Sequence, residues 1–132
     1  MFYGVLTPGS SVDAAASYIF NQTMLTNTNV SYNSTTGLFT FRRPGLYKIS
    51  FNTSGAGTAA ITPTLVLTGN LSTTALAKMT PTAVTDFRSC GFESVVRVDA
   101  GPAGTFATMN ILNNGTSAET VASGDIVIER IA

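Results

Sequence analysis

The stretch that decides the fold is Tyr32–Phe51, which reads YNSTTGLFTFRRPGLYKISF. Its last residues alternate in character, because single polar residues separate the large apolar side chains of Tyr47, Ile49 and Phe51. A period of two places these three side chains on one face of a β-strand. The Pro44–Gly45 step predicts a tight connection before this strand, since proline fixes φ and glycine accepts a positive φ.

The rest of the chain shows the same short apolar runs, broken by glycine, proline, asparagine and serine, which are typical of all-β proteins. We expect strands at 28–32, 37–42, 45–53, 61–68, 75–80, 86–98, 104–113 and 124–131. Helical periodicity is nearly absent. Residues 13–20 fit either two helical turns capped by Asp13 or an approach to a strand. This many strands in 132 residues predicts a sandwich or jelly roll in a single domain.

Two features near the C-terminus refine this expectation. The run Ile126–Ile131 has apolar residues on both faces, which is typical of a strand covered on both sides in the middle of a sheet. Upstream, Asn113-Asn114-Gly115 is a signal for a type I′ hairpin turn.

Composition excludes several classes of function. The chain has 7 basic and 7 acidic residues, no histidine and one cysteine, Cys90. The absence of histidine excludes a Ser-His-Asp triad and every histidine-ligated metal site. The balanced charge disfavours electrostatic binding to nucleic acid or to an anionic membrane. We therefore expect a protein that is not an enzyme and binds no cofactor.

The remaining candidate chemistry is sparse. Cys90 has no base nearby in sequence, which favours a small buried residue over a nucleophile. Asp99 and Asp125 each adjoin turn-like sequence and are an alternative Ca²⁺ pair, although no Asp-x-Asp spacing supports it. Our prediction is that there is no catalytic residue and no metal site.

The polar surface is made of hydroxyl and amide groups. The sequence contains 21 threonines, 12 serines and 9 asparagines, whereas charged residues make up only 11%, against about 25% in an average protein. Low charge gives little repulsion between molecules. Such a surface suits a chain that is partly covered by copies of itself.

The stretch Tyr32–Phe51 resembles the G-x-F-x-h-x-x-x-G-x-Y-x-h-x-h pattern, where h is hydrophobic, of the complement C1q and tumour-necrosis-factor-like jelly-roll family. The matching residues are Gly37, Phe39, Pro44, Gly45, Tyr47 and Phe51. Residues 123–132 resemble the closing strand of that family, and the resemblance covers about residues 28–132. It is particularly similar to the collagen-like exosporium glycoproteins of spore-forming bacteria and to related phage proteins.

This resemblance implies an all-β, ten-strand jelly-roll sandwich that assembles as a homotrimer. Residues 21–132 would form the jelly-roll domain, and residues 1–20 an N-terminal arm or first strand. The inner sheet would pack about the three-fold axis. The trimer interface is then expected to include Tyr47, Ile49, Phe51, Phe106, Ile126 and Ile128.

The N-terminus lacks a basic segment followed by an apolar core, so we expect no secretory signal, and no stretch is long and apolar enough to cross a membrane. A trimer without a stalk, made in a cytoplasm, suits a phage virion surface: a head decoration, a head fibre or a tail-fibre tip. Residues 1–20 would dock it on a capsid or tail protein. The alternative is an exosporium-type or other binding head at a spore or cell surface. Its loops at residues 55–62 and 69–85 would then recognise a carbohydrate or a protein receptor.

Overall fold

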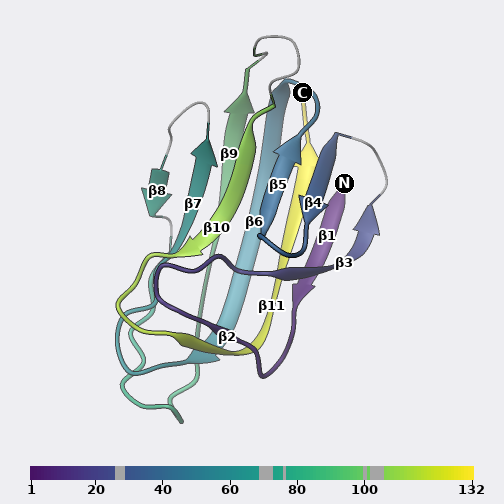
Figure 1. The fold of residues 1–132 in the computed structure, drawn as a ribbon. Coiled ribbons are helices and arrows are strands. Elements are labelled where there is room, and N and C mark those ends of the chain that lie inside the picture. Colours follow the sequence, from purple (N-terminus) through teal and green to yellow (C-terminus); the bar gives the residue numbers. More distant parts are fainter. Residues whose placement is uncertain (26–28, 69–72, 76, 100, 102–105) are drawn as a thin grey trace.

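The computed structural model describes residues 1–132 except 26–28, 69–72, 76, 100 and 102–105. Within the described residues the chain forms two packed antiparallel sheets and no helix (Figure 1). The strands are β1 (Phe2–Leu6), β2 (Ser11–Val12), β3 (Phe20–Leu25), β4 (Val30–Asn33), β5 (Leu38–Phe41), β6 (Gly45–Ala56), β7 (Pro63–Thr68), β8 (Thr73–Ala75), β9 (Arg88–Val98), β10 (Thr108–Asn113) and β11 (Glu119–Arg130).

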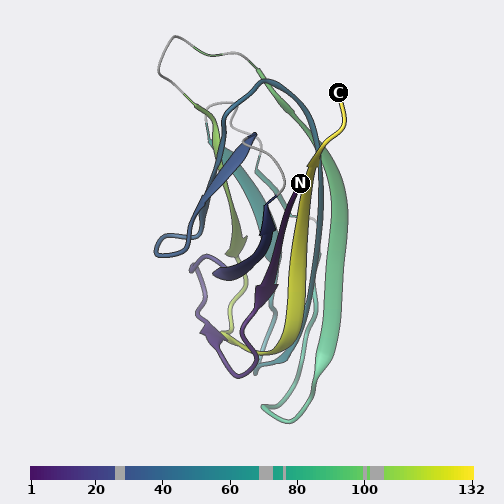
Figure 2. The ribbon, with the colours of Figure 1, turned by 90° about the vertical axis from the view of Figure 1, so that its right-hand side faces the viewer.

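The six-stranded sheet has the order β3-β1-β11-β6-β9, with the two-residue β2 paired to β11. The five-stranded sheet has the order β4-β5-β10-β7-β8. The two sheets lie face to face as layers of a sandwich (Figure 2). This confirms the predicted all-β jelly-roll architecture, with ten main strands besides β2.

β11 lies in the middle of its sheet, as its sequence predicts. It pairs with β1 on one side, where Ile128 faces Phe2, and with β6 on the other, where Ile128 faces Ile49. The N-terminal and C-terminal strands are therefore neighbours. Residues 1–20 contribute β1 and β2 to the same sheet.

The core fills the space between the two sheets and is rich in aromatic rings. Phe2 meets Phe39 edge-on at a centroid distance of 4.9 Å, and Phe20 meets Phe51 in the same way at 6.0 Å. Each of these pairs joins one strand to another across or along the sandwich. Burying one such side chain contributes about 1.5–3 kcal/mol to stability, so this cluster is the main source of cohesion between the layers.

Two local predictions are wrong, and the structure decides between the two alternatives left open for residues 13–20. Residues 13–20 contain no helix, because Tyr18 N donates to Ile111 O at 2.8 Å in an extended approach to β3. The strand expected at 75–80 is β8 at Thr73–Ala75, while Met79 only bridges to Ile61. Asn113 does not turn a hairpin, because β10 and β11 belong to different sheets.

The tight connection before β6 is confirmed. Gly45 has φ +147°, where a side chain would also meet the Ala132 carbonyl oxygen. The Tyr47 hydroxyl donates to the Arg43 carbonyl at 2.7 Å and holds the connection closed.

Candidate functional site

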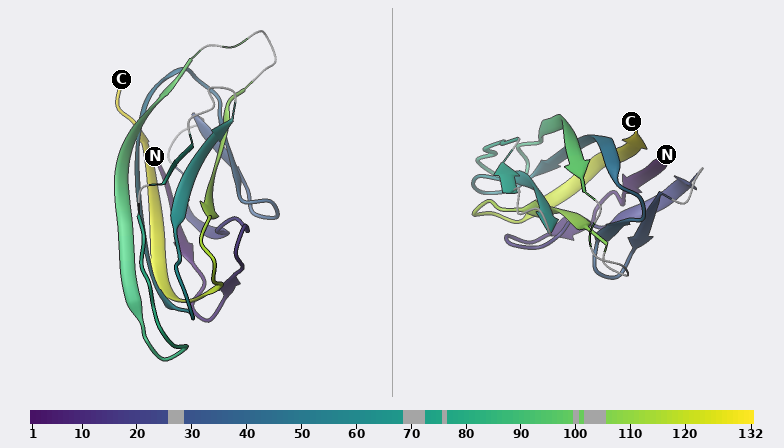
Figure 3. Two further views of the ribbon diagram at one scale, coloured as in Figure 1. Left: turned by 90° about the vertical axis from the view of Figure 1, so that its left-hand side faces the viewer. Right: turned by 90° about the horizontal axis from the view of Figure 1, so that it is seen from above.

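One face of the six-stranded sheet points away from the five-stranded sheet, and no other described element covers it (Figures 2 and 3). We call this surface the open face. Because buried and exposed side chains alternate along each strand, its residues can be assigned. They are Tyr3 and Val5 of β1, Ser123, Asp125, Val127 and Glu129 of β11, Leu46, Lys48, Ser50, Asn52 and Ser54 of β6, and Ser89, Glu93, Val95 and Arg97 of β9.

The open face carries little uncompensated charge. Lys48 Nζ lies 3.2 Å from Glu93 Oε1 on the neighbouring strand, and Arg97 Nε lies 2.9 Å from Asp99 Oδ1. Between these pairs, Val95 is 56% exposed and Leu46 is also exposed. Exposed apolar side chains with ion pairs at their sides match the apolar centre and polar rim of a protein–protein interface.

Towards the end of the sheet where β9 begins, the open face is hollowed. The hollow has a volume of about 380 Å³, and its lining includes Ser54, Ser89, Ser123 and Gly124. Gly124 cannot carry a side chain here, because a Cβ would lie 2.5 Å from Leu6 Cδ1 and 2.6 Å from Asn52 O. The hollow therefore results from small residues that meet on three adjacent strands.

Asp125 forms one wall of the hollow and is already hydrogen-bonded. Asn52 Nδ2 donates to its Oδ1, and the Tyr3 hydroxyl donates to its Oδ2 at 3.4 Å. Asp99 does not approach it. Asp99 directly follows Val98, whose partner on β6 is Gly45, whereas the partner of Asp125 on β6 is Asn52. Gly45 and Asn52 are seven residues apart, so Asp99 and Asp125 are separated by about 20 Å along the sheet. Within the described ranges, no group of three or more metal-ligating side chains forms a metal site.

The structure places five of the six expected interface residues inside the protomer. The side chains of Tyr47, Ile49, Phe51, Ile126 and Ile128 are buried in the core. Their strands β6 and β11 do form the centre of the open face, but the residues next to them in sequence point outward. The alternation identified these strands. It does not determine whether the larger side chains on these strands face the second sheet of the same protomer or a neighbouring subunit.

The sixth residue, Phe106, is exposed, and the Arg42 guanidinium lies 5.2 Å from its ring centroid. It follows β9 and precedes β10 at one end of the sandwich. Sequence reasoning missed outward apolar residues such as Leu46, Val95 and Val127. The signal that could have identified them is their position in the strand, one residue from a buried neighbour.

The two loops expected to bind a receptor meet at one end of the molecule. Ile61 and Met79 exchange backbone hydrogen bonds of 2.9 and 3.0 Å. Residues 69–72 and 76 of the second loop lie outside the described residues. Its last part presents Val84, which is 69% exposed, and Phe87, just beyond the predicted loop, is 58% exposed.

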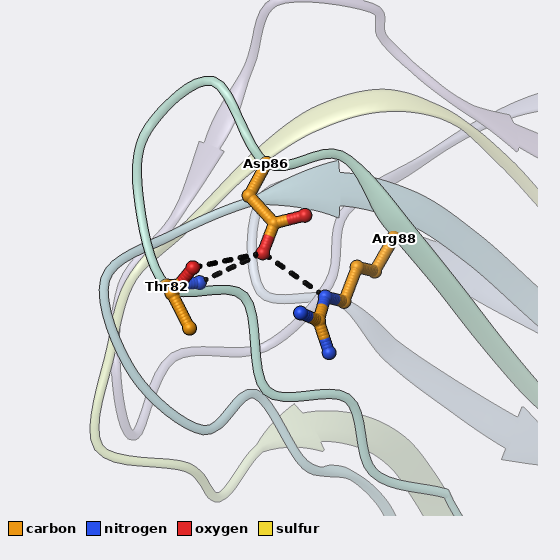
Figure 4. Close-up of polar contacts among 3 residues, drawn as sticks. All are labelled: Thr82, Asp86 and Arg88. Atoms are coloured by element: carbon orange, nitrogen blue, oxygen red, sulfur yellow. Dashed lines mark hydrogen bonds and ion pairs between the residues drawn. The ribbon is translucent and has the colours of Figure 1, made fainter.

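This part of the loop is held by Asp86 (Figure 4). Asp86 Oδ2 accepts hydrogen bonds from Thr82 N at 3.0 Å, from Thr82 Oγ1 at 3.2 Å and from Arg88 Nε at 3.0 Å. The hydrogen bond from the Thr82 backbone is the main cause that lowers the pKa of Asp86. The carboxylate therefore closes residues 82–88 into a defined turn.

A second polar cluster lies between the sheets. Glu119 is fully buried, and its carboxylate accepts hydrogen bonds from the hydroxyls of Tyr18 and Thr53. Burial raises the pKa of Glu119, and the two hydrogen bonds offset part of this effect. Burial, with the nearby Glu119 charge, raises the pKa of the Cys90 thiol to about 11. Cys90 is thus half-buried and protonated at neutral pH, which makes it a poor nucleophile.

No helix in the described part of the chain is long and apolar enough to cross a membrane.

Comparison with solved structures finds the same fold at low sequence identity. The Eiger TNF of S. frugiperda is 12% identical, with 99% of this chain and 93% of that chain covered and a TM-score of 0.72. Murine APRIL is 9% identical over 98% of both chains, with a TM-score of 0.69. The PRD1 vertex protein P5 is 12% identical, with 99% of this chain and 96% of that chain covered and a TM-score of 0.64.

No curated protein sequence matches this chain significantly. The model of the C1q domain family, however, matches residues 1–99, which is well over half of the chain. The match begins at β1 and ends just after β9, so it takes in all the strands of the six-stranded sheet except β11. Together with the two-sheet topology, this match shows that the chain belongs to the C1q domain family.

Proposed function

We propose that the protein is a non-enzymatic structural homotrimer that assembles through the open face. The observation that carries the proposal is an uncovered sheet face on which Lys48 and Arg97 are ion-paired and apolar side chains, above all Val95 and Leu46, are exposed to water. Membership of the C1q domain family supports the same assembly, because its domains are typically binding or structural modules.

An interface of standard size would supply a hydrophobic gain that favours the trimer. An interface of standard size buries about 800 Å² per partner. If about 60% of this area is apolar, the gross hydrophobic gain is on the order of 10 kcal/mol at about 25 cal/mol per Å². The entropic cost of association cancels much of this gain. Assembly would therefore rest on shape and apolar burial, with little contribution from surface ion pairs.

In this proposal the trimer is a component of a phage virion surface, such as a head decoration, a head fibre or a tail-fibre tip. The fold similarity to the PRD1 vertex protein P5 supports this placement. Residues 1–20 supply both β1 and the exposed turn at Thr7–Gly9, so attachment to a capsid or tail protein would use that turn and leave β1 in the sheet.

The experiment is sedimentation velocity at micromolar concentration, where the trimer has three times the 13.7 kDa mass of the chain. Val127→Lys places a charge in the middle of the open face and should give a folded monomer. Val66→Lys is the matched control, because Val66 is a partly exposed valine of β7 in the five-stranded sheet. A monomeric wild-type protein, or equal dissociation by both variants, would contradict the assembly. Absence of the protein from purified particles would contradict the virion role.

The second candidate is a binding head at a virion, spore or cell surface that recognises a carbohydrate or a protein receptor. The observation that favours it is Val84, 69% exposed on a loop that Asp86 holds in place. A glycan array and particle adsorption with and without the protein test this candidate. It fails if the array shows no binding and adsorption is normal without the protein.

A further inference from the structure

We propose that Phe87 of one copy inserts into the hollow in the open face of a neighbouring copy, and that this contact fixes the register of the trimer. The proposal rests on the proposed assembly through the open face. It goes beyond that assembly by naming the side chain and the cavity that meet.

Phe87 has the properties of an anchor. Its ring is 58% exposed, although it directly precedes β9. The loop before it is held by the three hydrogen bonds to Asp86 Oδ2 (Figure 4). A side chain on a loop that is already ordered loses little conformational entropy on binding, and aromatic anchors dominate the energetics of interfaces.

The hollow has the properties of a receiving site. Small side chains leave a volume of about 380 Å³, and nothing in its own protomer fills it among the described residues. Its acidic wall, Asp125, already accepts hydrogen bonds from Asn52 and Tyr3, so an apolar ring would not leave this carboxylate without partners. The Tyr3 ring at the rim offers an aromatic neighbour, which adds to the favourable contact.

Symmetry brings the two features together. Arg88 pairs with Gly55 and Ser89 with Ser54, while Ser54 pairs with Ser123. Phe87, two residues before Ser89 in sequence, therefore lies at the same end of the strands as the hollow. A rotation about an axis parallel to the strands preserves position along the strands, so it can carry the ring of one copy to the hollow of the next. A contact between two different patches repeats around the axis and closes into a ring.

Phe87 does not contact the hollow of its own chain in the structure. Phe87 is not among the residues that line the hollow. Ser123 lies on β11 and Phe87 adjoins β9, with β6 between them. Two strand spacings of about 4.8 Å and an offset of two residues along the strand separate their Cα atoms by more than about 10 Å, which exceeds the roughly 7 Å limit of a disulfide. A disulfide between these two positions would therefore report contact between copies.

The test combines Phe87→Cys and Ser123→Cys in a Cys90→Ser background, followed by mild oxidation and non-reducing gel electrophoresis. We expect covalent dimers and trimers from the double variant and none from either single variant. The matched pair Val84→Cys with Ser123→Cys should not cross-link, because Val84 lies at the loop tip. Absence of cross-linking in a protein that sediments as a trimer would overturn this inference and leave the proposed assembly intact. A monomer in sedimentation would overturn both.

Alanine substitution gives an independent measure. Phe87→Ala should raise the concentration at which the trimer is half dissociated by about tenfold or more, as loss of an interface anchor does. Val84→Ala should leave it unchanged. Equal effects of the two substitutions would mean that Phe87 has no special role, which would overturn the inference.

Discussion

The hydroxyl of Tyr18 donates a 2.6 Å hydrogen bond to Oε1 of Glu119, and both side chains are fully buried. Tyr18 lies just before β3, whereas Glu119 is the first residue of β11. The Thr53 hydroxyl donates to the other carboxylate oxygen, and no ion pair within the described ranges involves Glu119. An acidic group thus joins the N-terminal segment to the middle of the six-stranded sheet without a cation.

We predict that Glu119 makes the protein more stable in mild acid. Burial raises its pKa in the folded state above the ordinary value of about 4.3. Its contribution to the free energy of unfolding is therefore complete below the ordinary pKa and is lost as pH rises through the folded pKa. Urea denaturation between about pH 4 and pH 7 checks this, with the Glu119→Gln variant as the reference.

The glutamine variant is a fair control because it is isosteric and can still accept from Tyr18 while donating to Thr53. Subtracting its pH profile removes the contributions of all other titrating groups. We expect the free energy of unfolding of the wild-type protein to fall relative to that of the glutamine variant as pH rises. A difference that is flat, or that shifts in favour of the wild-type protein, would contradict the raised pKa.

Removing the donor instead should destabilise the fold. Tyr18→Phe keeps the ring, which packs at 5.0 Å against Phe51, but leaves Glu119 Oε1 without this hydrogen bond. An unsatisfied buried acceptor costs about 1–3 kcal/mol. Equilibrium denaturation at neutral pH measures the loss. Tyr32→Phe is a useful comparison, since it removes a hydroxyl that accepts a hydrogen bond from the backbone N–H of Phe20 at a less buried site.

Asp86→Ala should loosen its loop without unfolding the domain. The substitution removes every acceptor that Asp86 offers to Thr82 and Arg88. We expect faster amide hydrogen exchange at Thr82 and faster tryptic cleavage after Arg88, with a thermal midpoint close to that of the wild-type protein. Unchanged exchange at Thr82 would show that the carboxylate does not order the turn.

Gly124→Ala should destabilise the six-stranded sheet. The added Cβ would lie 2.6 Å from the Asn52 carbonyl oxygen, which belongs to the backbone and cannot rotate away. Overpacking of this kind costs about 1–3 kcal/mol. Thermal denaturation measures the effect, and Ser123→Ala at the adjacent exposed position should have almost none. Equal stability of the two variants would contradict the close approach.

The alternation around Tyr47 and the apolar run at Ile126 were sufficient to predict an all-β sandwich and the central position of β11. Both signals depend on local periodicity, which a sequence shows directly. The same periodicity does not determine which part of the protein, or which other subunit, covers each face of a strand. Tyr47, Ile49 and Phe51 were therefore expected at a trimer interface, whereas in the structure their side chains are in the core.

Asn113 shows another limit. Its Asn-Asn-Gly context is typical of a hairpin, but its buried amide instead accepts from Thr62 N and Gly115 N and donates to the carbonyls of Val12 and Ser117. The side chain thus supports a crossing between sheets, which depends on partners far away in sequence. Glu119 is a similar case, because among scattered carboxylates nothing in the sequence marks the one that becomes buried.

The place of β11 between β1 and β6 also has a consequence for biosynthesis. The two halves of the six-stranded sheet share no strand pairing until residues 119–130 have left the ribosome. Phe2 of β1 pairs with Ile128 of β11, more than a hundred residues later in the chain, so the sheet is completed only after β11 has been synthesised. Pairing between strands so far apart in sequence makes folding slow. A ribosome stalled before β11 would hold a chain with two open strand edges, a state that chaperones must protect from aggregation.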